Sequence, residues 1–246
     1  MISRPSPNHD ARPAGAAVDM LILHYTGMAD AALALERLCD PASGVSAHYI
    51  VDEAGAVYHL VPEARRAWHA GESLWRGRGD VNALSIGVEV VNPGHELGYR
   101  PFPEAQMAAV ETLCREVVAR HPIPARHVLG HSDVAPARRR DPGELFDWRR
   151  LAAAGVGLWP RSNVVTGEMG LSVRPGDSGD AVADLQRGLA DFGYGLAVDG
   201  VCGDATRHVV VAFQRHFRGR RVDGVADPET AQLVFQVAAQ ATGAGA

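Results

Sequence analysis

Hydrophobic positions in the first part of this chain alternate between strand-like runs and helical repeats. Val18–Leu23 and Ser85–Val91 are short and almost wholly apolar, which is typical of buried strands. Pro101–Arg120 carries apolar residues at helical spacing, with Pro103 close to its expected first turn. We therefore expect an α/β (α+β) domain, with a mixed central β-sheet flanked by helices.

Shorter patterns complete this first domain. Ala31–Leu38 repeats alanine and leucine at helical spacing. His48–Val51 and Ala56–Val61 flank a turn that contains Gly55, which predicts a hairpin. His127–Leu129 is the last strand expected in this part of the chain.

The pattern changes after residue 160. Residues 161–170 contain few apolar positions and are expected to form a linker. Beyond them, two similar Asp-Gly turns, at 198–206 and 222–230, each precede an expected capped helix. We thus predict a larger first domain over 1–160. A small all-α three-helix domain over 171–240, which is expected to fold by itself, and a frayed tail over 241–246 follow it. Three apolar stripes define the helices of the three-helix domain: Val182, Leu185, Leu189 and Phe192; Val209, Val210, Phe213 and Phe217; Leu233, Val234 and Val237.

Candidate chemistry gathers at the ends of the predicted strands. His24 ends the first apolar run, and His131 and Asp141 lie in the segment GHSDVAPARRRDPG at 130–143. Two histidines and a carboxylate are the ligands of a catalytic zinc that keeps one position open for water. Glu89, between two valines of another strand, could be the base that such a water needs. The alternative is that His24 merely ends a strand, Asp141 caps a helix after Pro142 and Glu89 faces solvent; spacing alone does not decide.

These motifs carry a resemblance to a known family. The sequences His24-Tyr25-Thr26, Ile86-Gly87-Val88-Glu89 and GHSDVAPARRRDPG resemble the zinc-dependent N-acetylmuramoyl-L-alanine amidases of the type-2 amidase family, in its AmpD- and AmiD-like branches. The resemblance covers roughly residues 5–160, and its separated motifs occur in the order of the family. It implies one Zn²⁺ held by His24, His131 and Asp141.

The resemblance also implies roles for neighbouring side chains. Glu89 corresponds to the family's general base, and Arg139 occupies the place of a lysine that stabilises the oxyanion. Arginine keeps the charge but has a different shape, so Arg138 or Arg140 could share the task. Substrate contacts are expected from four further residues, although a partly buried loop is the alternative for the first two. They are Trp68, His69, Asn82 and Tyr49.

The second domain resembles the three-helix peptidoglycan-binding domain attached to many cell-wall hydrolases, which implies a peptidoglycan or anhydro-muropeptide substrate. Together the two resemblances predict an enzyme that cuts between N-acetylmuramic acid and L-alanine in cell-wall turnover or recycling. A non-catalytic peptidoglycan receptor on the same fold is the main alternative, but it would usually lack part of the metal set. A wall-anchored peptidase would require different motifs.

Composition and charge exclude other classes of partner. The net charge is −5 and no basic stripe is present, which argues against binding to nucleic acid. Cys39, Cys114 and Cys202 lack the spacing of a zinc cluster or a disulfide framework. No apolar run is long enough to span a membrane, and no signal-peptide core is visible. We expect a cytoplasmic monomer, or a periplasmic protein if a signal has been removed.

Overall fold

A six-stranded mixed sheet forms the centre of the first part of the chain. The computed structural model describes residues 1–160 and 172–243, and its strand order is β1-β5-β4-β7-β3-β8. All neighbouring strands run parallel except β4 and β5, which form the predicted hairpin. The strands are β1 (Ile2–Ser3), β3 (Met20–Tyr25), β4 (Tyr49–Val51), β5 (Val57–His59), β7 (Ser85–Val90) and β8 (Val128–Gly130).

The central strand β3 is buried on both faces. Leu21 and Leu23 belong to the core that α4 (Glu104–Arg120) covers, whereas Met20 and Ile22 belong to the core on the opposite face. Because side chains alternate along a strand, His24 continues the second face, away from α4. The helix α4 begins at Glu104 and not at Pro101, since a residue that precedes proline disfavours helical backbone.

Several short elements were not predicted from the sequence. The strands β2 (His9–Ala11) and β6 (Arg65–Ala67) form a separate antiparallel pair. Their residues carry no alternating hydrophobic pattern, so the pairing depends on contacts between distant segments.

The helix expected over residues 31–38 is present as α1 (Ala31–Cys39). The other helical elements of this part are η1 (Pro41–Ser43), α2 (Val81–Leu84), α3 (Gly94–Leu97), η2 (Ala125–His127), α5 (His131–Val134) and α6 (Trp148–Ala153).

The predicted three helices are present as α7 (Asp180–Phe192), α8 (Asp204–Phe217) and α9 (Pro228–Gly243). A glutamine organises each Asp-Gly turn: the Oε1 atoms of Gln186 and Gln214 accept from the backbone amides of Gly200 and Gly224, respectively. Only one of the two expected helix N-caps is present. Asp227 accepts from the backbone of α9, whereas α8 has no side-chain cap.

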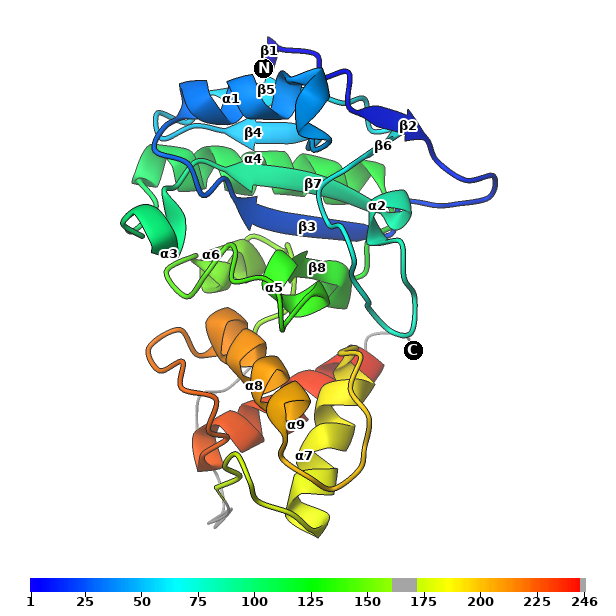
Figure 1. Cartoon of the computed structure of the whole chain (residues 1–246), viewed down its shortest axis with the longest axis vertical. Helices are drawn as coiled ribbons and strands as arrows, with labels where there is room; N and C mark the ends of the chain where they lie inside the picture. Colours follow the sequence, from blue (N-terminus) through cyan, green and yellow to red (C-terminus); the bar gives the residue numbers. More distant parts are fainter. Residues whose placement is uncertain (161–171, 244–246) are drawn as a thin grey trace.

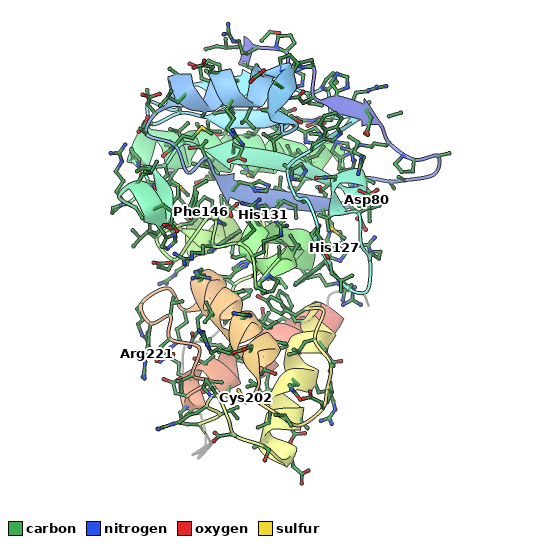
Figure 2. All side chains as sticks on the ribbon, in the orientation of Figure 1. Asp80, His127, His131, Phe146, Cys202 and Arg221 are labelled. Carbon is green, nitrogen blue, oxygen red and sulfur yellow. The ribbon has the colours of Figure 1, made fainter. Side chains whose placement is uncertain are left out.

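The three helices pack against the β8 side of the sheet, below α5 and α6 (Figure 1). Figure 2 places His127 on the side of the α/β part that faces them and Cys202 among them. One apolar cluster runs through both parts, from Met20 and Ile22 of the sheet to Phe213 of α8. The helices therefore share an apolar cluster with the α/β part, and their folding as an independent domain stays a prediction.

Specific contacts reinforce this junction. Trp75 is fully buried, with its ring 5.2 Å from that of Tyr194. The carboxylate of Asp133 accepts from the Tyr194 hydroxyl and from His216 Nδ1, both at 2.7 Å. The expected tail also differs, because α9 continues to Gly243 and the carbonyl of Ala241 accepts from Arg126 at 2.7 Å. The expected linker at 161–170 lies outside the described residues.

Glu63 ties the hairpin to the end of α4. It accepts from Tyr49 at 2.8 Å, from Arg120 at 2.7 Å and from His121 at 2.9 Å. Burial alone would raise the pKa of Glu63, but these hydrogen bonds outweigh it and lower the pKa to about 2. The ionised carboxylate therefore stabilises the fold above its unfolded pKa, and this contribution is lost as the pH falls through about 2.

We predict that Glu63→Gln lowers the free energy of unfolding at pH 7 by about 1–3 kcal/mol, because three donors lose a charged acceptor. The difference from the parent should shrink as the pH falls from about 4.5 towards 2. Urea unfolding at several pH values measures this. A constant difference across that range would show that Glu63 is not the responsible carboxylate.

Candidate active site

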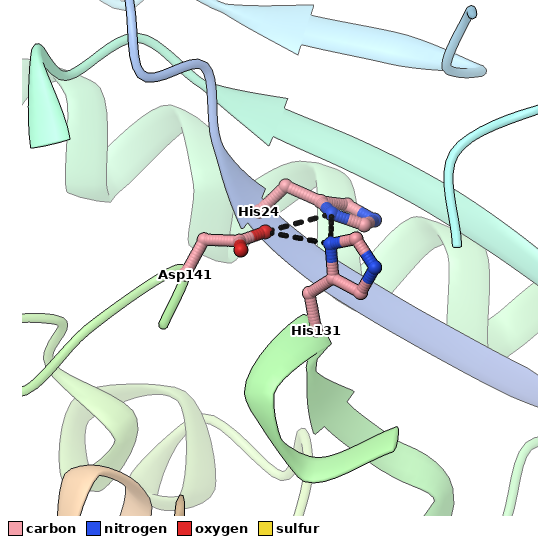
Figure 3. A group of neighbouring side chains, drawn as sticks. All are labelled: His24, His131 and Asp141. Atoms are coloured by element: carbon pink, nitrogen blue, oxygen red, sulfur yellow. Dashed lines mark hydrogen bonds and ion pairs between the residues drawn. The ribbon is translucent and has the colours of Figure 1, made fainter. Parts of the chain in front are cut away.

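Three ligand-type side chains from distant segments meet at one point. His24 is the last residue but one of β3, His131 begins α5, and Asp141 comes from the loop that follows α5. His24 Nδ1 lies 3.0 Å from both His131 Nδ1 and Asp141 Oδ2, and the latter two atoms are 2.9 Å apart (Figure 3). All three residues are buried.

Hydrogen bonds on the far sides of both rings decide where their protons are. His131 Nε2 lies 2.9 Å from the carbonyl of Ala70 and must donate to it, which leaves Nδ1 without a proton in the neutral ring. Burial, followed by the neighbouring His131, lowers the pKa of His24 to about 4, so that ring is neutral at ordinary pH.

A chain of three buried hydrogen bonds fixes the His24 ring in the same tautomer. The Ser85 hydroxyl donates to the carbonyl of Val81 at 2.6 Å and can therefore accept from His69 Nε2 at 3.1 Å. His69 Nδ1 is then free to accept from His24 Nε2 at 3.0 Å. The His24 Nδ1 atom thus presents a lone pair to the same point as His131 and Asp141.

Three lone-pair atoms facing one another at about 3 Å repel unless a cation lies between them. The Asp141 Oδ2 atom completes this group, within 3.0 Å of both nitrogens. Two imidazoles and a carboxylate suit a divalent metal with an open coordination position. The residues present therefore fit a resident metal ion.

The loop that contains His69 and Ala70 is held by hydrogen bonds to its backbone amides. Asn82 Oδ1 accepts from the amides of His69 and Ala70, at 3.0 and 2.8 Å. Gly87 leaves room for the imidazole, because a Cβ atom there would lie 2.5 Å from the His69 ring. Asn82, expected to contact substrate, does not line the cavity and instead positions this loop.

Glu89 stands beside His24 because β3 and β7 pair in register at these residues. It lines a cavity of about 480 Å³ that also contains His24, His131 and Asp141. Its Oε2 atom is buried and has no hydrogen-bond partner among the described residues. Burial, reinforced by Asp141, raises the pKa of Glu89 well above its usual range, while Arg139 opposes the shift. A carboxyl group with a raised pKa can accept and return a proton during a reaction.

The three adjacent arginines have different partners. Arg138 donates to the carbonyls of Ala70 and Glu72, at 2.8 and 2.5 Å. Arg140 approaches the exposed Glu96 at 3.3 Å. Arg139 lines the cavity, and within residues 1–160 and 172–243 its side chain has no hydrogen bond or ion pair.

The other expected contacts separate into two groups. Trp68 and His69 line the cavity, although His69 also serves the hydrogen-bond chain behind His24. Tyr49 bonds to Glu63 and is not among the lining residues. Asp141 does not cap a helix, since the next helix, α6, is capped by Asp147. Sequence analysis missed Ser85, which begins a strand and carries no recognisable signal.

Comparison with known families settles which chemistry this arrangement belongs to. Residues 14–144 match the family described as N-acetylmuramoyl-L-alanine amidase. The chain belongs to the N-acetylmuramoyl-L-alanine amidase family. Residues 178–234 match a peptidoglycan-binding domain. This amidase is 37% identical to the amidase AmiD of Escherichia coli over 225 residues, covering 87% of this chain and 79% of AmiD.

Solved structures agree over both parts of the chain. A complex of Escherichia coli AmiD with anhydro-N-acetylmuramic acid-L-Ala-D-γ-Glu-L-Lys superimposes with a TM-score of 0.79 at 34% identity, covering 93% of this amidase and 92% of AmiD. AmpDh3 from Pseudomonas aeruginosa gives 0.80 at 31% identity, covering 93% and 94%. The fold of this amidase, including its helical region, is therefore shared with these relatives.

We predict that Ser85→Ala weakens metal binding by about 10–100-fold, because the chain that orients His24 loses its terminal acceptor. Competition with a chromophoric chelator measures zinc affinity without relying on turnover. Ser73→Ala is the matched control, since Ser73 is half-buried and, among the described residues, its hydroxyl bonds only to the carbonyl of Gly71. Equal affinities for the two folded variants would remove Ser85 from the support of His24.

Proposed function

We propose that this amidase hydrolyses the amide between the lactyl group of N-acetylmuramic acid and L-alanine, with one Zn²⁺ held by His24, His131 and Asp141. The observation that carries the proposal is the meeting of three metal-ligand atoms beside Glu89, whose buried Oε2 has no hydrogen-bond partner among the described residues. The relative crystallised with an anhydro-muropeptide supports the same substrate class. The family comparison favours hydrolysis over the receptor and peptidase alternatives.

Zinc, when bound, would polarise the scissile carbonyl and lower the pKa of the attacking water. Glu89 then has two proton-transfer steps. Its Oε2 accepts a proton as the water oxygen adds to the carbonyl carbon, and it returns that proton to the nitrogen as the carbon–nitrogen bond breaks. The products are a free lactyl carboxylate and the amine of L-alanine. The raised pKa of Glu89 suits it to both steps.

Arg139 is the side chain we assign to oxyanion stabilisation. It lines the same cavity, and its positive charge acts on both Glu89 and His24. Arg138 is held by two backbone carbonyls and Arg140 lies near Glu96, so neither is as free to face the substrate. A guanidinium that has no fixed partner can follow the charge that develops on the carbonyl oxygen.

The domain division is also a proposal. We assign residues 1–160 to catalysis and the three-helix domain to peptidoglycan binding, supported by the separate family matches. The shared core means that this domain additionally supports the catalytic part. Among the described helices, none is long and apolar enough to cross a membrane. The cytoplasmic location and the monomeric state stay predictions, which fractionation and light scattering would test.

For the base, we predict that Glu89→Gln retains zinc while turnover falls by about 10²–10⁴, the usual contribution of a general base. Mass analysis of a digested soluble muropeptide measures the rate and the position of the cut. Glu116→Gln, at an exposed site on α4, should behave like the parent. Near-normal turnover by zinc-loaded Glu89→Gln would require a different proton acceptor.

For the oxyanion, Arg139→Ala should lower kcat by about 10² or more. Arg139→Lys should keep much of the activity, because it restores the residue of the resembling enzymes and retains the charge. Both variants should bind zinc as the parent does. If the alanine and lysine variants lose activity equally, charge at residue 139 is not what stabilises the transition state.

For the domain junction, ending the chain at residue 160 should lower the melting temperature by roughly 5 °C or more, the effect of losing about 2 kcal/mol in a domain of this size. The truncation exposes Trp75 and removes Tyr194 and His216, two of the donors to Asp133, which lies two residues after His131. Activity on a soluble muropeptide should fall with it. Unchanged melting and activity would show that the helical domain is separable, as its sequence suggests.

A further inference from the structure

A second cavity, of about 280 Å³, lies between the 136–140 loop and α8. Five arginines line it, three from the loop and two from the helical domain, and no acidic side chain is among its described lining residues. The loop arginines, Arg138, Arg139 and Arg140, also line the catalytic cavity. The two cavities are therefore neighbours that share one cationic wall.

The helix α8 contributes a row of two arginines and one valine to this cleft. Arg207, Val211 and Arg215 follow one another at four-residue spacing on α8, so they share one face of the helix. In the described parts of the chain, the Arg207 guanidinium has no hydrogen bond or ion pair. The Nε atom of Arg215 is buried without a hydrogen bond, and its nearest carboxylate, that of Glu144, lies 3.8 Å away.

Positive charge concentrated in this way is unfavourable in the free protein. Burial lowers the pKa of Arg215, Glu144 opposes that shift and Arg140 adds to it, so the two arginines repel each other. The whole chain is acidic, with a net charge of −5. Of the five arginines, Arg140 pairs with Glu96 and Arg215 lies 3.8 Å from Glu144, whereas the other three have no ion pair among the described residues. An anionic ligand would relieve the repulsion and would gain paired hydrogen bonds from the guanidinium groups.

We propose that this cleft binds the free carboxylates of the wall peptide while its bond to the sugar is cut. The inference rests on the proposed function, because the ligand must extend from the catalytic cavity past Arg139. The peptide in the AmiD complex, L-Ala-D-γ-Glu-L-Lys, has the required chemistry. Its γ-linkage leaves one carboxylate free on the glutamate, and the lysine carries another. The helical domain thereby selects the substrate of the amidase in addition to contacting the wall.

The test uses the full zinc-loaded chain and two soluble anhydro-muropeptides that differ only in whether these carboxylates are free or amidated. We expect the parent to show a KM about 10-fold lower for the free acid, because one charge-assisted contact changes binding affinity by about tenfold. Arg207→Ala should raise the KM for the acid by about 5–10-fold, with kcat nearly unchanged, and should leave the amide's KM unaltered. Arg207→Lys should recover part of the loss.

Arg187→Ala is the matched control, because Arg187 lies on α7, pairs with Asp184 and is exposed. Equal KM values of the parent for acid and amide would overturn the proposal, as would an equal effect of Arg207→Ala on both substrates. Strong competition by inorganic phosphate without any carboxylate dependence would assign the cleft to a phosphate ligand instead. Failure of the parent to cut either substrate between sugar and peptide would contradict the proposed function itself.

Discussion

The arrangement of this molecule depends on the electrostatic conflict among His24, His131 and Asp141. Their ligand atoms lie about 3 Å apart in a buried site, and hydrogen bonds on the outer sides of both rings leave no proton between them. A cation bound between them would relieve this repulsion, so we expect metal binding to stabilise the fold. The surrounding structure serves to keep the three atoms in place.

The support comes from unrelated parts of the fold. Register between β3 and β7 places Glu89 beside His24, and the absence of a side chain at Gly87 admits the His69 ring behind it. Asp133 ties the turn after His131 to the helical domain through Tyr194 and His216. The helical domain thus contacts the short helix that begins at His131.

The sequence predicted the longer elements because their apolar periodicity reflects which face is buried. It predicted the candidate ligands and Glu89 because strand ends display polar groups that a core would otherwise exclude. It could not predict that Tyr49 and Asn82 would turn to Glu63 and to the loop backbone, since such partners are set by tertiary contacts. The role of Ser85 was not predicted for the same reason. The apolar cluster shared by the sheet and the helices was not predicted either, because the apolar periodicity of each part is complete without the other.

Anomalous diffraction from crystals of the full chain, grown with one equivalent of zinc and measured on both sides of the zinc absorption edge, tests the central claim most directly. The account predicts one strong peak within bonding distance of His24 Nδ1, His131 Nδ1 and Asp141 Oδ2, at about 2.0–2.2 Å from each. A peak elsewhere, or no peak in a protein that still cuts muropeptides in the presence of a chelator, would contradict it.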